Sequence, residues 1–256
     1  MKFFKIEKKA SLETLSFFYP LFAIMLFLII PYFLTKHVIL LIYRLTSLNT
    51  LELQTWAQVI NGLFTALSFI CLASIQKNRV WKLFFLKRIK LIPLFLLTLL
   101  IYVISLPIIS FVDYAVEHLT YALFGTFTID QLAVRFIKSV LPYPYLLSLA
   151  IFATVILAPF CEEFLFRGFI QNSLKRLFGL IPTLLITSLL FSLIHYSPSQ
   201  GYANLPLLTT LFVFSLFLGF SYEKTGSLLA PIFLHLIFNL VTILRIMALY
   251  SASNTL

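Results

Sequence analysis

The sequence predicts an all-α fold, a polytopic transmembrane helical bundle. Of its 256 residues, 61% are hydrophobic and only 11% are charged, and the mean hydropathy is +1.02. A soluble protein of this length could not bury so much apolar surface, so lipid must be its solvent. Several apolar stretches also reach about 20 residues, the length that a helix needs to cross a bilayer. Both observations place the chain in a membrane.

We expect about seven to eight spans. The apolar stretch 37–45 is too short to cross alone, but it leaves room for an eighth crossing. The stretch 113–141 mixes charged with aromatic residues, which predicts interfacial helices or a re-entrant segment rather than a span. The seven predicted spans are, in chain order, 15–35, 55–76, 91–112, 144–173, 180–197, 205–222 and 228–250.

Lysine and arginine residues predict the orientation. They stand near the ends of apolar stretches, so the net charge of +10 favours contact with anionic lipid headgroups over nucleic-acid binding. Most of the 19 fall in residues 1–9, in the loop 77–90 and in loops on the same predicted side. The positive-inside rule then predicts a multi-pass protein of the cell membrane with a cytoplasmic N-terminus. Cys71 and Cys161 both lie in apolar stretches, so we expect no disulfide.

One natural boundary divides the chain. Residues 141–144 read Leu-Pro-Tyr-Pro, a sequence that interrupts helices. We expect an N-terminal transmembrane region over 1–142, for which the sequence indicates no role. Residues 143–250 form the second domain and contain every candidate site residue.

The first functional signal is a charged cluster inside the span 144–173. Glu162 and Glu163 are adjacent, and Arg167 follows four residues after Glu163. Residues four apart share a helix face, which predicts an ion pair between Glu163 and Arg167. Glu162 points about 100° away and is left to exchange a proton with water, as a general base does. A charged cluster at a helix end on the membrane surface would look similar.

Two later spans carry histidines. His195 ends an apolar run, where histidine is often only an interfacial residue. His235 and Asn239 lie well inside the last span, and their spacing puts imidazole and amide on one helix face. Such a pair can also simply join helices by hydrogen bonds.

Depth favours one shared site. Counted at about 1.5 Å per residue from the predicted inner surface, Glu162, His195 and His235 all lie about 16–22 Å deep. Unrelated interfacial residues would have no reason to agree in depth. Ionisable groups in hydrocarbon cost several kcal/mol unless they are paired or hydrated, so such residues indicate a functional site by default. A catalytic centre inside the membrane is therefore the leading hypothesis.

The ordered motifs E-E-x-x-x-R, F-x-x-x-H and H-x-x-x-N resemble the CAAX prenyl protease type 2 family, also called Abi or CPBP, over roughly 145–245. The resemblance implies a CPBP-type intramembrane protease domain over 143–250, a hydrolase in which glutamate activates water. Its substrates would be membrane-associated or prenylated, CAAX-type, proteins or peptides. The implied catalytic residues are Glu162, His195, His235 and Asn239, with Glu163 and Arg167 in supporting roles.

A metal is a separate question. The family is commonly classed with metalloproteases, and two histidines with a carboxylate can hold a catalytic zinc. Glu162, His195 and His235 are therefore candidate ligands of one divalent metal such as zinc. The chain has no H-E-x-x-H helix, however, and a glutamate alone could activate water with the same residues. The sequence leaves both mechanisms open.

Two other functions compete with proteolysis. Intramembrane carboxylates and imidazoles also form proton relays, so a small proton-coupled transporter is one alternative. A non-catalytic binding or immunity protein of the same fold is the other. The transporter would be favoured by two related halves with broken helices, which the sequence does not show. Loss of a site residue would favour the silent binder, but all six are present.

Overall fold

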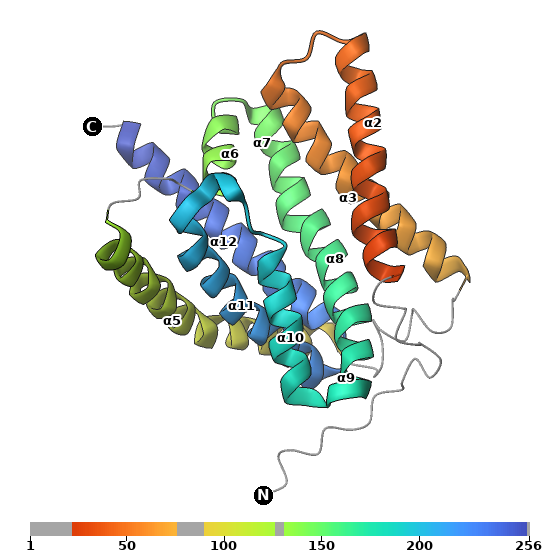
Figure 1. Ribbon diagram of the computed structural model, residues 1–256, viewed down its shortest axis with the longest axis vertical. Coiled ribbons are helices and arrows are strands. Elements are labelled where there is room, and N and C mark those ends of the chain that lie inside the picture. The colour runs from red at the N-terminus through yellow and green to blue at the C-terminus, as the bar shows by residue number, and fades with distance from the viewer. Residues whose placement is uncertain (1–21, 76–89, 126–130, 255–256) are drawn as a thin grey trace, which may run out of the picture.

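The computed structural model describes residues 22–75, 90–125 and 131–254, and helices are the only regular structure in these ranges (Figure 1). The predicted all-α polytopic bundle is confirmed. Successive long helices run in alternating directions, and α5 crosses the bundle obliquely (Figure 1). The elements are η1 (Met25–Ile29), α2 (Ile30–Leu45), α3 (Thr50–Ile75), α5 (Leu91–Phe124), α6 (Leu132–Val140), α7 (Pro144–Ile151), η2 (Phe152–Leu157), α8 (Ala158–Glu163), η3 (Phe164–Gln171), α9 (Asn172–Phe178), α10 (Leu180–Leu193), η4 (Pro198–Ala203), α11 (Asn204–Thr225) and α12 (Leu229–Asn254).

Six described helices are long and apolar enough to cross a membrane. The predicted span 180–197 is not among them: it forms α10, which has only 14 residues. At 1.5 Å per residue it is about 21 Å long, less than the roughly 30 Å hydrocarbon core. The six are Phe22–Leu45, Thr50–Leu72, Leu91–Phe124, Pro144–Phe178, Pro198–Thr225 and Leu229–Ser253.

Two boundary predictions were wrong. Residues 37–45 make no separate crossing, because they continue α2 without a break; the first part of the predicted span 15–35 lies outside the described residues. Residues 113–124 likewise form no separate helix, because α5, which is 34 residues long, continues through them and ends before Gly125, whose φ is 77°. Asp113 does not interrupt the helix, because its carboxylate accepts a hydrogen bond from Thr210 of α11 at 2.9 Å. Only α6 is the short separate helix that the prediction described.

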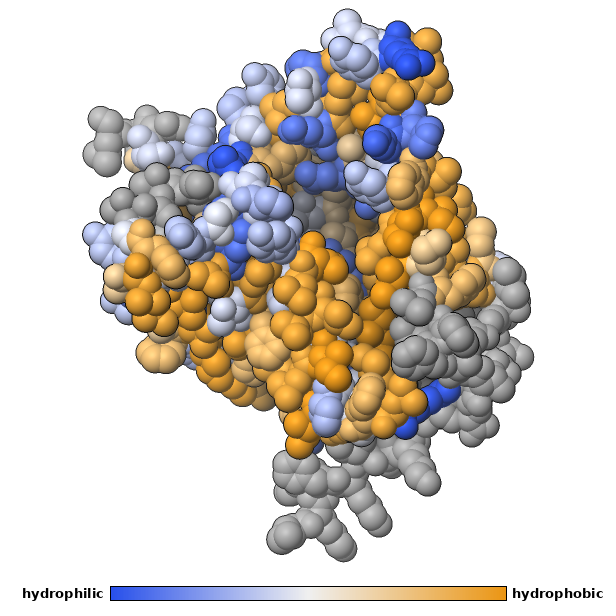
Figure 2. Space-filling view, in the orientation of Figure 1, coloured by the Kyte–Doolittle hydropathy of each residue, from blue (hydrophilic) through white to orange (hydrophobic). Residues whose placement is uncertain are grey.

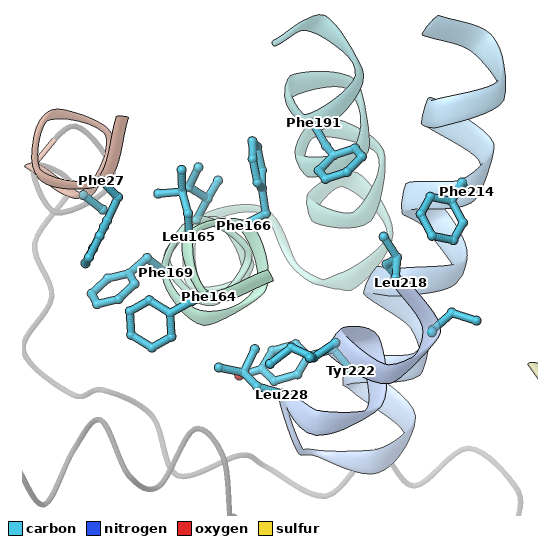
Figure 3. Close-up of a cluster of buried hydrophobic side chains, with 14 of the residues drawn as sticks. Phe27, Phe164, Leu165, Phe166, Phe169, Phe191, Phe214, Leu218, Tyr222 and Leu228 are labelled. Atoms are coloured by element: carbon cyan, nitrogen blue, oxygen red, sulfur yellow. The ribbon is translucent and has the colours of Figure 1, made fainter. Parts of the chain in front are cut away.

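Aromatic side chains hold the centre of the bundle together. Buried phenylalanines from η1, η3, α10 and α11 belong to one hydrophobic cluster, which includes Phe164, Phe166 and Phe169 of the segment 164–171 (Figure 3). Phe27 contacts Phe164 edge to face at a centroid distance of 5.6 Å, and Phe166 contacts Phe191 at 5.2 Å. In lipid, helices associate through such close packing rather than through release of water. This packing fixes the helix that carries the glutamates between η1, α10 and α11.

The outer surface is apolar. Large hydrophobic side chains such as Ile92 and Phe111 of α5 and Leu189 of α10 are mostly exposed. Figure 2 shows an almost unbroken hydrophobic surface over the lower part of the molecule and polar residues gathered at the upper end. A water-soluble protein avoids apolar patches of this size, so this surface faces lipid. The protein is a multi-pass membrane protein.

Candidate active site

The helix that carries both glutamates is continuous from Pro144 to Phe178, but it is not a regular α-helix. Two π-helical segments, η2 and η3, lie directly before and after α8. The amide of Ala158 bonds to the carbonyl of Ala153, five residues back, just before Pro159, which has no amide hydrogen to donate. Wider turns of this kind often occur at functional sites, because they rotate side chains away from regular helical positions.

Glu163 is the centre of a buried ion-pair cluster. Its carboxylate lies 2.9 Å from Nη1 of Arg167, and both side chains are fully buried. The ion pair predicted from their spacing is therefore present. Nη2 of Arg167 donates to Ser215 of α11, to the carbonyl oxygen at 2.9 Å and to the hydroxyl at 2.6 Å. The guanidinium also lies over the ring of Phe191, 4.9 Å from its centroid, which is a cation–π contact.

His235 joins this cluster from α12. Its Nδ1 lies 2.9 Å from Oε1 of Glu163, an arrangement in which Nδ1–H donates to the carboxylate. Two aromatic rings flank the imidazole, Phe191 at 5.8 Å and Phe214 at 5.4 Å between centroids, and only 5% of the residue is exposed. With Nδ1 bound to Glu163, Nε2 remains for contact with a reacting group.

Asn239, one turn further along α12, contacts the same helix. Its Nδ2 donates to the backbone carbonyl of Thr154 at 2.9 Å. His235 and Asn239 therefore both face the segment 144–178, as their spacing predicted. The contact fixes the orientation of the Asn239 amide, because its nitrogen is held by a helix carbonyl that the π-helical segment η2 exposes.

Glu162 points elsewhere, into a pocket of about 250 Å³ between η1, α3 and the segment 153–165. Its Oε2 is buried, yet it has no hydrogen-bond partner within the described part of the chain. The surface is visibly hollowed in the upper half of Figure 2, between the side formed by α2 and α3 and the side formed by α10 and α11. The pocket is lined by Phe27, Leu28, Gln58, Asn61, Gly62, Thr65, Ala153, Thr154, Ala158, Cys161, Glu162, Leu165 and Ile194.

His195 lies in the turn that follows α10. Its Nδ1–H donates to the carbonyl of Phe191 at 2.9 Å, so Nε2 is again the nitrogen left for other contacts. The ring packs against Phe191, whose other contacts include His235. Ile194, the preceding residue, lines the pocket of Glu162. Within the described residues, His195 makes no hydrogen bond to either glutamate.

The six candidate residues thus fall into two groups. Glu163, Arg167 and His235 are directly bonded to one another. In the described ranges the others are not bonded to this cluster: Glu162 lines the pocket, Asn239 bonds to Thr154, and His195 packs against Phe191. Sequence reasoning missed Ser215, because a serine in an apolar span is ordinary. Phe191 is the phenylalanine of the F-x-x-x-H motif, but the motif did not indicate its contact with Arg167.

The candidate metal ligands do not come together in the described structure. No group of three or more His, Cys, Asp or Glu side chains in the described ranges has the grouping that holds a metal ion. The Nδ1–H bonds of both histidines resemble those that orient metal ligands, but the same bonds orient a histidine toward water. As placed, Glu162, His195 and His235 do not form a three-ligand site. Cys71 and Cys161 are both free thiols, as expected.

Comparison with known proteins finds a family model that matches part of the chain. Residues 144–241 match the family described as Rce1-like, type II CAAX prenyl endopeptidase. The match covers every candidate site residue and confirms the resemblance stated from the motifs. It leaves the first half of the chain outside. No curated protein and no solved structure matches the chain.

Proposed function

From the Rce1-like family match over 144–241, we propose that this membrane protein is an intramembrane endopeptidase with Glu162 as the base that activates water. One observation carries the assignment. Of the two adjacent glutamates, Glu163 forms ion pairs with Arg167 and His235, whereas Glu162 lines a pocket. A general base must contact the water that it deprotonates, and the pocket gives water access to Glu162.

Hydrolysis then proceeds in two steps. A water in the pocket gives a proton to Glu162 while its oxygen attacks the carbonyl carbon of the scissile peptide bond, which forms a tetrahedral oxyanion. Nε2 of His195 or His235, with the Asn239 amide nearby, supplies positive or hydrogen-bonding stabilisation to this oxyanion. Protonated Glu162 returns the proton to the amine as the carbon–nitrogen bond breaks, which balances the reaction and regenerates the base.

Glu163 and Arg167 act through His235. The ion pair fixes the carboxylate, and the carboxylate in turn fixes the tautomer and orientation of the imidazole, so that Nε2 is the nitrogen left for the reacting groups. Ser215 and Phe191 hold the guanidinium from the opposite side. Preorganised groups of this kind contribute to catalysis because they need no rearrangement when charge develops.

The family description suggests the substrate class. A type II CAAX prenyl endopeptidase acts on the C-terminal region of a prenylated protein, and we propose a membrane-associated or prenylated protein or peptide for this chain. The apolar surface around the pocket suits a substrate that arrives from the bilayer.

The test is cleavage by purified protein in lipid nanodiscs of an internally quenched, farnesylated peptide that ends in a CAAX sequence. Wild type should release the last three residues, and Glu162→Gln should abolish cleavage, since the amide keeps the shape but cannot accept the proton. Glu117→Gln is the matched control, because Glu117 is an exposed glutamate on α5, outside the pocket. Full activity of Glu162→Gln would remove Glu162 as the base.

A further inference from the structure

Helix α3, from the half of the chain outside the family match, forms part of the wall of the pocket that contains Glu162. At Gly62, α3 closely approaches the helix 144–178, which carries Glu162. A side-chain carbon at this position would lie only 3.0 Å from the Leu157 side chain, and Cys161 Sγ lies 3.6 Å from the Gly62 carbonyl oxygen. Cys161 directly precedes Glu162, so the absence of a side chain at Gly62 brings α3 beside the proposed base.

Three polar residues of α3 line the pocket next to this contact: Gln58, Asn61 and Thr65. Their spacing of three and four places them on one helix face. The Thr65 hydroxyl is used internally, since it donates to the carbonyls of Asn61 and Phe27. The amides of Gln58 and Asn61 are different. In the described structure the Gln58 amide has no hydrogen bond, and Asn61 only accepts a long one, at 3.5 Å, from Thr35.

The depth of these amides makes them unusual. Asn61 is eleven residues from either end of the span Thr50–Leu72, about 16 Å from each at 1.5 Å per residue. In a span centred on the bilayer, Asn61 lies near the middle and Gln58 one turn away. Both side chains are exposed rather than buried in protein, and both line the pocket. An amide exposed to lipid at this depth would be costly, so we expect both to face the pocket.

We propose that Gln58 and Asn61, the α3 amide pair, bind the peptide backbone of the substrate beside Glu162. An Asn or Gln side chain carries the same donor and acceptor groups as a peptide bond, so it can pair with a backbone carbonyl and amide of any sequence. Asn61 Nδ2 donates to a substrate carbonyl, and Gln58 both donates and accepts. Both are positioning residues. The inference rests on the proposed peptidase function and assigns a role to a region that the family match leaves without one.

Binding and cleavage of the farnesylated CAAX peptide test the two ideas separately. Binding is measured by fluorescence anisotropy in the Glu162→Gln background, and cleavage in otherwise wild-type protein. Asn61→Leu and Gln58→Leu should each raise Kd and KM about five- to tenfold with little change in kcat, because the lost hydrogen bond acts equally before and during the reaction. Gln54→Leu is the matched control: the same substitution, one turn earlier on α3 and outside the pocket.

A second measurement identifies the group that the pair binds. Peptides with an ester in place of either peptide bond flanking the scissile one lack an N–H donor and have a weaker carbonyl acceptor. At least one ester should bind more weakly than the parent peptide to the Glu162→Gln protein with an unaltered α3. This loss should largely disappear when Asn61→Leu or Gln58→Leu is added. Equal loss in wild type and both variants would overturn backbone binding. Thermal unfolding of each variant checks that it is folded.

The outcomes separate the inference from the proposed function. Cleavage that depends on Glu162, with Kd and KM unchanged in Asn61→Leu and Gln58→Leu, would overturn the α3 amide pair and leave the peptidase intact. Peptide binding that depends on the pair, without any cleavage, would support the pair and refute peptidase activity. Wild type that neither binds nor cleaves the prenylated peptide would overturn both.

Discussion

The ion pair between Glu163 and Arg167 offers the sharpest test of the site geometry. Arg167→Met keeps an apolar stem of similar length against Phe191 but removes the charge that neutralises Glu163. Both residues are fully buried, and the salt bridge is 2.9 Å long. Removing one partner of such a pair costs about 3–5 kcal/mol, because the other charge stays buried and uncompensated. The hydroxyl of Ser215 loses its partner as well.

The assay is thermal unfolding in detergent, in which the fraction of protein that remains folded is measured as temperature rises. For a protein of this size, about 1 kcal/mol shifts the Tm by 2–4 °C, so we expect Arg167→Met to lower it by roughly 6–20 °C. The double variant Glu163→Gln/Arg167→Met removes both charges and should recover part of that loss. A single variant as stable as wild type would refute the buried pair, and so would a double variant less stable than the single one.

Three further predictions concern the chemistry and the topology. His235→Ala should lower kcat about 100- to 1000-fold while the protein still inserts and folds, which steady-state kinetics on the farnesylated peptide would measure; activity close to wild type would remove His235 from the centre. Exhaustive chelation, with metal content followed by elemental analysis, should leave cleavage unchanged, because the described histidines and Glu162 do not form a three-ligand group; activity that is lost and then restored by zinc would require a different arrangement. A reporter fused after Lys90 should report the cytoplasm and one after Gly125 the opposite side, since α5 lies between them and is long and apolar enough to cross; the same side for both would contradict a crossing by α5.

Local helix geometry explains why part of the site could be read from the sequence. The Glu163–Arg167 ion pair and the shared face of His235 and Asn239 depend only on residues four apart in a helix, and both are present. Counting depth along each span also predicted that the three motifs lie in one region, because residues at equal depth in neighbouring helices lie near one another, and Phe191 contacts Arg167, His195 and His235. The roles of these residues in catalysis stay predictions.

The span boundaries show the limits of composition. Charged residues in 113–141 suggested that the third span ends before them. Asp113 instead lies within α5, where Thr210 hydrogen-bonds its carboxylate, and the helix ends only at Gly125. The short α10 read as a full span, because its apolar run continues into the turn at His195. Whether a polar group ends a helix depends on its partner in another helix, and composition does not contain that partner.

The sequence by itself determined that this chain lies in lipid, that it is helical, and which polar side chains share a helix face. Only the tertiary structure decided which groups of other helices complete the cluster around Glu163 and which surface Glu162 faces. His235, Ser215 and Phe191 come from three other helices to engage Glu163 and Arg167, while Glu162 is left facing a pocket partly walled by α3. The physical reason is that helical periodicity is local, whereas the partner of a buried charge is chosen by packing between segments far apart in the chain.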